Sequence, residues 1–319
     1  MADWLIERGI AEDRALLVGG DRVLAARVYW PGEPYAGEVL DAKLTTRRSG
    51  SARGVATAAT GLEILLDKLP PGLTEGSSLK VMLTRPPIAE RGRMKQAQGR
   101  MAEDGGIAHP FAALDGTEVR RFPAGLWEDL WDAAASGEIG FAGGSLLFSV
   151  TPAMTLVDID GDGSPGALSL AAIEPLARAL RQFDCGGSIG VDFPTIADKP
   201  GRKAVDAALD KALARWPHER TAMNGFGFVQ IVARLTGPSL LHRMASARVA
   251  AAARMALRRA EMAEGAGITL LTVHPAVRAK LDDAWLAELE RRTGRPYRVV
   301  TDPSLAIEAA QAQIVAPDR

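Results

Sequence analysis

The sequence has very few of the sulfur and imidazole groups that commonly bind transition metals. Cys185 is the single cysteine in 319 residues, which excludes an internal disulfide and a zinc site made from several cysteines of one chain. No two of the four histidines have the spacing of a metal-ligand pair: His109, His218, His242 and His274. We therefore expect no zinc in this protein.

Strong overall charge and long apolar segments are also absent. The formal net charge is −1, so any binding to nucleic acid must depend on local basic patches. No apolar run reaches the roughly 20 residues that span a bilayer. The first residues lack the basic stretch and apolar core of a signal peptide. We expect a cytoplasmic protein that has no membrane partner.

The first hundred residues contain many short apolar stretches separated by turn residues. Gly19–Arg22 joins two such stretches and predicts a hairpin over 16–30. Further short strands are predicted between residues 38 and 83, where glycine, proline and serine separate them. Closely spaced short strands favour a small barrel, and an OB-like module is the natural candidate. A β-barrel without any ligand fits the same pattern.

A basic segment follows the predicted barrel. It has five cations within 16 residues, opposed only by Glu90: Arg85, Arg91, Arg93, Lys95 and Arg100. Such a cluster can follow a phosphate backbone, and a solvated linker is the alternative interpretation.

The middle of the chain has the order strand, helix, strand. Apolar runs at 146–150 and 155–160 precede a helical pattern over 168–183, and a further apolar run covers 188–193. This order predicts a βαβ unit with parallel strands. Asp158 and Asp192 would then stand side by side at the carboxyl ends of neighbouring strands, where open α/β sheets place their sites.

Two carboxylates this close repel each other unless a cation or a shared proton relieves them. A hard cation such as Mg²⁺, held by one or two carboxylates, water and phosphate oxygens, fits best. Two other interpretations remain open. Asp158–Gly163 resembles the start of a calcium loop, although Ser169 replaces the glutamate required at position 12. Gly161–Gly166 has the spacing of a dinucleotide-binding loop, where nearby acids would repel a pyrophosphate.

The last part of the chain combines a long helix with further α/β elements. Ser239 is a plausible N-cap for a helix that extends to about residue 264. Six arginines and no acid lie between 234 and 259, and those from Arg243 onward fall on an arc of roughly 160°. This arc predicts a basic face suited to phosphates, although an ordinary exposed helix face would look similar. Residues 268–301 predict a small α/β domain.

Several motifs, taken in order, resemble the ribonuclease E/G family. They are Leu5–Glu7, Arg14–Val18, Gly143–Ser145, Asp158–Asp160, Asp184–Phe193, Phe226–Gly227 and Pro238–Leu240. The β-rich segment occupies the place of the family's S1 domain, an RNA-binding module of the OB type. The resemblance implies an endoribonuclease that uses Mg²⁺, or Mn²⁺, to hydrolyse single-stranded RNA and leaves 5′-phosphate products.

The resemblance also implies roles for individual residues. Asp158 and Asp192 match the two metal-binding aspartates, and Asp160 stands where the family has asparagine, as a third catalytic acid. Lys95 falls near an RNA-contacting lysine of the family. The residues expected to contact RNA are Arg91, Arg93, Lys95, Arg100, Arg234 and Arg243.

The expected fold is α/β, as a multidomain α+β chain. It has five parts: amino-terminal strands (1–35), an S1/OB-like module (36–100), a connector with part of an RNase H-like subdomain (101–145), a catalytic metal-binding domain (146–245) and an arginine-rich helix with a small α/β domain (246–319).

The chain also departs from the family pattern. Most of the 5′-phosphate sensor segment and the Cys-x-x-Cys zinc link are missing, so a homo-oligomer would have to form without that link. The arginine expected after the Phe-Gly pair falls on Ala233, with Arg234 one position later. These departures keep a second hypothesis open, namely an RNA-binding protein of the same fold with weak or no catalysis.

Overall fold

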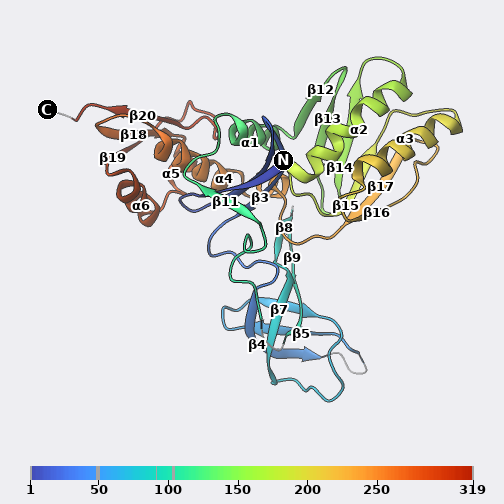
Figure 1. Cartoon of the computed structure of the whole chain (residues 1–319). Coiled ribbons are helices and arrows are strands. Elements are labelled where there is room, and N and C mark those ends of the chain that lie inside the picture. Colours follow the sequence, from blue (N-terminus) through green and yellow to red (C-terminus); the bar gives the residue numbers. More distant parts are fainter. Residues whose placement is uncertain (1, 48–50, 91, 103–104, 318–319) are drawn as a thin grey trace.

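The computed structural model describes residues 2–47, 51–90, 92–102 and 105–317. Its fold is mixed α/β, as predicted, and Figure 1 shows how the parts are arranged. A small amino-terminal sheet lies near the centre of the view, and a closed barrel extends below it. A six-stranded sheet with its helices lies to one side, and the carboxy-terminal elements lie to the other. No helix among the described residues is both long and apolar enough to cross a membrane.

The amino-terminal sheet has the strand order β11-β1-β2-β3. Its strands are β1 (Ala2–Arg8), β2 (Asp13–Gly19), β3 (Arg22–Tyr29) and β11 (Gly116–Val119). The predicted hairpin is formed by β2 and β3. Strand β11, which the sequence did not suggest, follows the barrel and pairs in parallel with β1 through Trp4 and Gly116. The barrel is therefore an insertion between two strands of one sheet.

The inserted barrel is closed, with the order β10-β6-β5-β4-β7. Its strands are β4 (Val39–Arg47), β5 (Gly54–Ala58), β6 (Glu63–Leu66), β7 (Ser78–Arg85) and β10 (Ala97–Ala102). Alternate residues point inward and form a separate core that includes Leu44, Ile64 and Val81. The predicted OB-like barrel is thus confirmed. A short hairpin, β8 (Ile88–Glu90) with β9 (Arg93–Lys95), lies between the barrel and the rest of the molecule (Figure 1).

The six-stranded sheet has the order β12-β13-β14-β15-β17-β16. Its strands are β12 (Glu138–Phe141), β13 (Gly144–Val150), β14 (Thr155–Gly161), β15 (Gly187–Asp192), β17 (Phe228–Ala233) and β16 (His218–Arg220). Helix α2 (Pro165–Gln182) connects β14 to β15, and these strands are parallel, so the predicted βαβ unit is confirmed. Figure 1 shows α2 and α3 (Lys199–Leu213) on the same side of this sheet.

The carboxy-terminal part begins with a long helix, α4 (Leu240–Met262), which is kinked at Ala247. Ser239 caps it, as predicted, by accepting a hydrogen bond from the backbone N–H of His242. The remaining elements are β18 (Ile268–Val273), α5 (Pro275–Arg278), α6 (Asp283–Thr293), β19 (Tyr297–Thr301) and β20 (Gln311–Val315). They form a three-stranded sheet, β19-β18-β20, that packs with α4. Helix α1 (Leu126–Ser136) places Trp127 and Trp131 in the main core.

The arginines of α4 do not form the basic face that their spacing predicted. Arg243, Arg254 and Arg258 are buried, and each contacts the amino-terminal strands or the segment after them. The guanidinium of Arg254 lies 3.7 Å from the centroid of the Trp30 ring, and that of Arg243 lies 4.3 Å from it. The expectation of an open phosphate-binding face was wrong because these arginines have partners in distant parts of the chain, such as Glu33 for Arg243 and Glu7 for Arg258.

Glu7 on β1 is the centre of this buried ion network. Its carboxylate accepts hydrogen bonds from Arg14 Nη1 at 2.8 Å, Arg258 Nε at 2.8 Å and the backbone N–H of Phe122 at 3.1 Å. Burial by itself raises the pKa of Glu7, but the Arg258 hydrogen bond, the two guanidinium charges and the Phe122 N–H together lower that pKa below its ordinary value. One ionised carboxylate thus joins β1, β2, α4 and the segment before α1.

We expect Glu7→Gln to lower the free energy of unfolding by about 3–5 kcal/mol, because two buried guanidiniums lose their shared charge partner. Since the pKa of Glu7 is lowered in the folded state, its contribution is present above pH 4.5 and is lost as pH falls through the folded pKa. Urea denaturation at several pH values measures both effects. Glu118→Gln is the control, because its pair with Arg8 is largely exposed; equal losses in both variants would contradict this account.

Candidate functional site

Asp158 and Asp192 are direct neighbours in the six-stranded sheet. The parallel register of β14 and β15 pairs the two residues, as the βαβ reading predicted. Neighbouring strands lie about 4.8 Å apart, so the two side chains leave the sheet next to each other. Both residues are exposed, whereas Val157 and Val191 beside them are buried on the opposite face. The face that carries the acids is therefore the one that α2 and α3 leave uncovered, and we call it the open face.

Apolar side chains surround this pair on the open face. Leu147 of β13 is opposite Asp158, and Phe228 of β17 is opposite Asp192. A side chain at Gly190 would collide with the Phe228 ring, since a Cβ atom there would lie 2.5 Å from Phe228 Cζ. Glycine at this position lets the ring pack closely beside the acids. The two carboxylates thus leave the sheet next to apolar side chains and remain exposed to solvent.

The carboxylates of Asp158 and Asp192 have no hydrogen bond or ion pair with any residue that the structure describes. Two adjacent, unpartnered carboxylates are a donor set that fits a hard cation completed by water and phosphate oxygens. No group of three His, Cys, Asp or Glu residues able to hold a metal occurs among the described residues. Asp160 lies two residues farther along β14, and its Oδ1 accepts the N–H of Gly161 at 2.9 Å. The role of Asp160 as a third catalytic acid stays a prediction.

The calcium-loop interpretation is contradicted by the fold. Asp158 and Asp160 belong to strand β14 and not to a loop. Ser169, at the twelfth position, is fully buried in α2 and donates its hydroxyl hydrogen to the carbonyl of Pro165. It cannot reach an ion held at the start of the motif.

The β8–β9 hairpin carries part of the predicted RNA-binding segment. Glu90, whose side chain is 2% exposed, pairs with Arg93 at 2.6 Å and with Lys95 at 2.7 Å. Burial raises the pKa of Glu90, but the two cations outweigh it and lower that pKa. The hairpin therefore keeps one net positive charge from these three groups. Arg93 also donates to the carbonyl of Pro152, just before β14, while Arg91 lies outside the described residues.

The other three predicted RNA contacts are brought together elsewhere. Arg100, Arg234 and Arg243 line one cavity of about 350 Å³ at the junction of the barrel and the two neighbouring sheets. Arg100 and Arg234 are exposed, whereas Arg243 is buried and pairs with Glu33 at 2.9 Å. Sequence reasoning missed the aromatic residues of this cavity, Tyr29, Tyr35 and Phe111, because nothing in their spacing relates them to one another.

Cys185 is buried beside this junction and is not suited to nucleophilic chemistry. Burial, followed by the neighbouring charge of Asp184, raises the pKa of the Cys185 thiol far above neutrality.

Comparison with known proteins shows sequence similarity over part of the chain. No family model matches the sequence. Over 113 residues, or 32% of this chain, it is 32% identical to ribonuclease G of Escherichia coli K12. The same identity over the same length is found with ribonuclease G of Shigella flexneri and of Salmonella typhimurium. The matched region spans only 23% of the length of the Escherichia coli protein. The chain is thus partly related to ribonuclease G.

We expect Mg²⁺ to raise the melting temperature of the wild type by roughly 2–4 °C for each kcal/mol of binding free energy. Asp158→Asn and Asp192→Asn should abolish that rise. In EDTA the same variants should be more stable than the wild type by about 0.2–1 kcal/mol, because like charges directly opposite each other in a sheet are destabilising.

Thermal unfolding over a Mg²⁺ and Mn²⁺ series measures both effects. Asp162→Asn is the matched control, since Asp162 is an exposed acid in the turn after β14. A metal-dependent rise that persists in the Asp158→Asn, Asp192→Asn double variant would place the ion elsewhere.

Proposed function

We propose that this protein is a metal-dependent endoribonuclease that hydrolyses phosphodiester bonds of single-stranded RNA. The observation that carries the proposal is the unpartnered Asp158–Asp192 pair, which lies on two adjacent strands of the open face. The partial similarity to ribonuclease G supports RNA as the substrate class. The proposed ion is Mg²⁺, with Mn²⁺ as a substitute.

Different residues of the chain have different roles in this proposal. Asp158 and Asp192 would hold the metal, which when bound activates a water molecule and offsets charge on the phosphate. The strand register fixes the spacing of their two carboxylates before RNA arrives. Leu147 and Phe228 flank the two acids on the same face of the sheet. Asp160, exposed on the same face, would add negative charge near the metal.

A path for RNA from the barrel to these acids is supported by the β8–β9 hairpin. Arg93 donates to Pro152, and Thr155 begins β14 three residues later. Asp158 lies three residues beyond Thr155 and therefore six beyond Pro152, at most about 20 Å along an extended chain. A phosphate backbone held at the hairpin would have to bridge a distance of this order to reach the carboxylates.

The alternative is an RNA-binding protein without efficient catalysis. It is favoured by the small number of free cations near the acids, because Arg93 and Lys95 share Glu90 and three arginines of α4 are buried, namely Arg243, Arg254 and Arg258. Salt-sensitive RNA binding with no turnover under Mg²⁺ or Mn²⁺ would favour this alternative.

The decisive measurement is cleavage of an end-labelled single-stranded RNA with Mg²⁺, Mn²⁺ or EDTA. We expect cleavage with either metal, none in EDTA, and products with 5′-phosphates. Asp158→Asn and Asp192→Asn should each lower the rate by at least about 100-fold, because charge stabilisation in the transition state is lost. Asp162→Asn should cleave at the wild-type rate. Activity that survives the double substitution Asp158→Asn and Asp192→Asn would contradict this mechanism.

We expect Arg93→Ala to weaken binding of a short oligouridylate and to reduce the slope of log affinity against log salt by up to about 0.7, the value for one phosphate contact on a single strand. Fluorescence anisotropy in EDTA between 50 and 200 mM salt, two ordinary laboratory concentrations, measures this slope. Arg215→Ala, an exposed arginine after α3, is the control. An unchanged slope in Arg93→Ala would exclude the hairpin from the RNA path.

A further inference from the structure

The cavity at the junction of the barrel with the two sheets is separate from the acidic pair. Its volume of about 350 Å³ is within the range of small-molecule sites, which are common between domains. Arg234, one of its lining residues, directly follows Ala233, which pairs with Gly187 at the start of β15. Asp192 is at the other end of that strand, five residues on, or about 16 Å away. A ligand here would not contact the acids of the open face.

The charges of this junction cavity favour an anion. Two of its four arginines are neutralised, since Arg27 pairs with Asp184 at 3.0 Å and Arg243 pairs with Glu33 at 2.9 Å. Arg100 and Arg234 form no ion pair with any residue that the structure describes. The cavity therefore has two unneutralised guanidiniums, which are donors suited to the oxygens of a phosphate.

A buried donor in the wall of this cavity also lacks a partner. The side chain of Arg243 is 6% exposed, and its Nε has no hydrogen-bond acceptor. Leaving a buried polar group unsatisfied costs free energy, and such groups call for a specific explanation. This Nε has almost no solvent-accessible surface, so a ligand in the junction cavity would reach it only after a shift of the Arg243 side chain.

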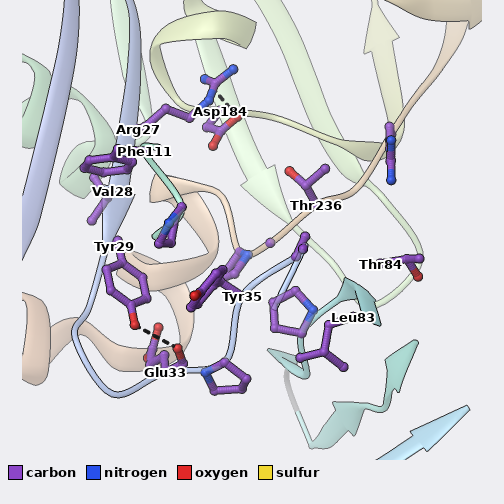
Figure 2. A pocket seen from close by; sticks show the side chains of 18 of the residues that line it. Arg27, Val28, Tyr29, Glu33, Tyr35, Leu83, Thr84, Phe111, Asp184 and Thr236 are labelled. Carbon is purple, nitrogen blue, oxygen red and sulfur yellow. Dashed lines mark hydrogen bonds and ion pairs between the residues drawn. The ribbon is translucent and has the colours of Figure 1, made fainter. Parts of the chain in front are cut away.

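Aromatic rings form one wall of the cavity. Tyr29 packs edge-to-face against Tyr35, with ring centroids 5.6 Å apart, and His109 links Tyr29 to Phe111 by two further edge-to-face contacts. The phenol of Tyr29 donates to the carbonyl of Glu33 and that of Tyr35 to the carbonyl of Ile107, so both rings are held in place. Figure 2 shows these two tyrosines across the cavity from Thr84, with the Arg27–Asp184 pair above them.

A planar ring surface next to free guanidiniums matches a ligand that joins an aromatic base to a phosphate. We propose that the junction cavity binds one nucleotide, with its base against Tyr35 and its phosphate at Arg100 and Arg234. The nucleotide can come from a free nucleoside monophosphate or from one unit of an RNA chain that passes between the barrel and the sheets. The proposal concerns binding alone and does not require hydrolysis at Asp158 and Asp192.

Isothermal titration of the full chain in EDTA tests this site, with AMP, adenosine, inorganic phosphate and a five-nucleotide RNA as probes. We expect AMP to bind at least ten-fold more tightly than adenosine or phosphate, because it uses both the rings and the guanidiniums. Arg234→Ala should weaken AMP about ten-fold or more, since a charge-assisted contact is lost. Arg215→Ala should leave AMP binding unchanged. Arg215 and Arg234 are exposed, so these substitutions leave the core intact.

The RNA probe distinguishes the two sources. If the site takes one unit of an RNA chain, the five-nucleotide RNA binds more tightly than AMP, and Arg234→Ala weakens the binding of both by the same factor. If the site takes only a free nucleotide, binding of the five-nucleotide RNA is insensitive to Arg234→Ala. AMP affinity should be the same in Asp192→Asn as in the wild type, which separates this site from the proposed hydrolysis. No binding of AMP or RNA, or equal AMP affinity in Arg234→Ala and the wild type, would overturn the nucleotide site.

Discussion

The arrangement of this protein depends on the ionised carboxylate of Glu7, which is buried where three elements meet. Arg14 and Arg258 both donate to it, and Trp30 donates its indole N–H to Glu12 in the same cluster. Buried charges are costly unless they are paired and hydrogen-bonded, so each member restricts where the others can lie. Helix α4 is thereby fixed to β1 and β2, although 251 residues separate Glu7 from Arg258.

Fixing α4 in this way also determines the surroundings of both proposed sites. Arg243 lies near the start of the same helix and reaches the junction cavity, where it pairs with Glu33 and covers the ring of Trp30. The barrel enters and leaves through this neighbourhood, because its chain departs after β3 and returns at β11. The basic hairpin, which is part of this insertion, touches the turn before β14. The inserted barrel is thus attached, through contacts at one end of the insertion, to the six-stranded sheet that carries Asp158 and Asp192.

The two proposed sites use different physical means. On the open face, two acids without partners on adjacent strands create a local excess of negative charge that a hard cation relieves. In the junction cavity, two arginines without acidic partners create an excess of positive charge beside fixed aromatic rings. An RNA strand carries phosphates that suit both places, as bridges to a metal at the first and as partners of guanidiniums at the second. The similarity to ribonuclease G covers only about a third of the chain, so the chemistry of the sites has to support these roles.

The sequence by itself determined the local structure and the acidic pair. Ser239 caps α4, and the strand–helix–strand order was sufficient to place Asp158 beside Asp192, because these features depend on short-range patterns and on the handedness of one crossover. Tertiary structure alone decided which charges are free. An arginine has the same helical spacing whether it faces water or a buried glutamate, so the α4 arginines were misread as a phosphate-binding face. Strand β11 and the junction cavity likewise arise from segments distant in the sequence, whose contacts no local pattern records.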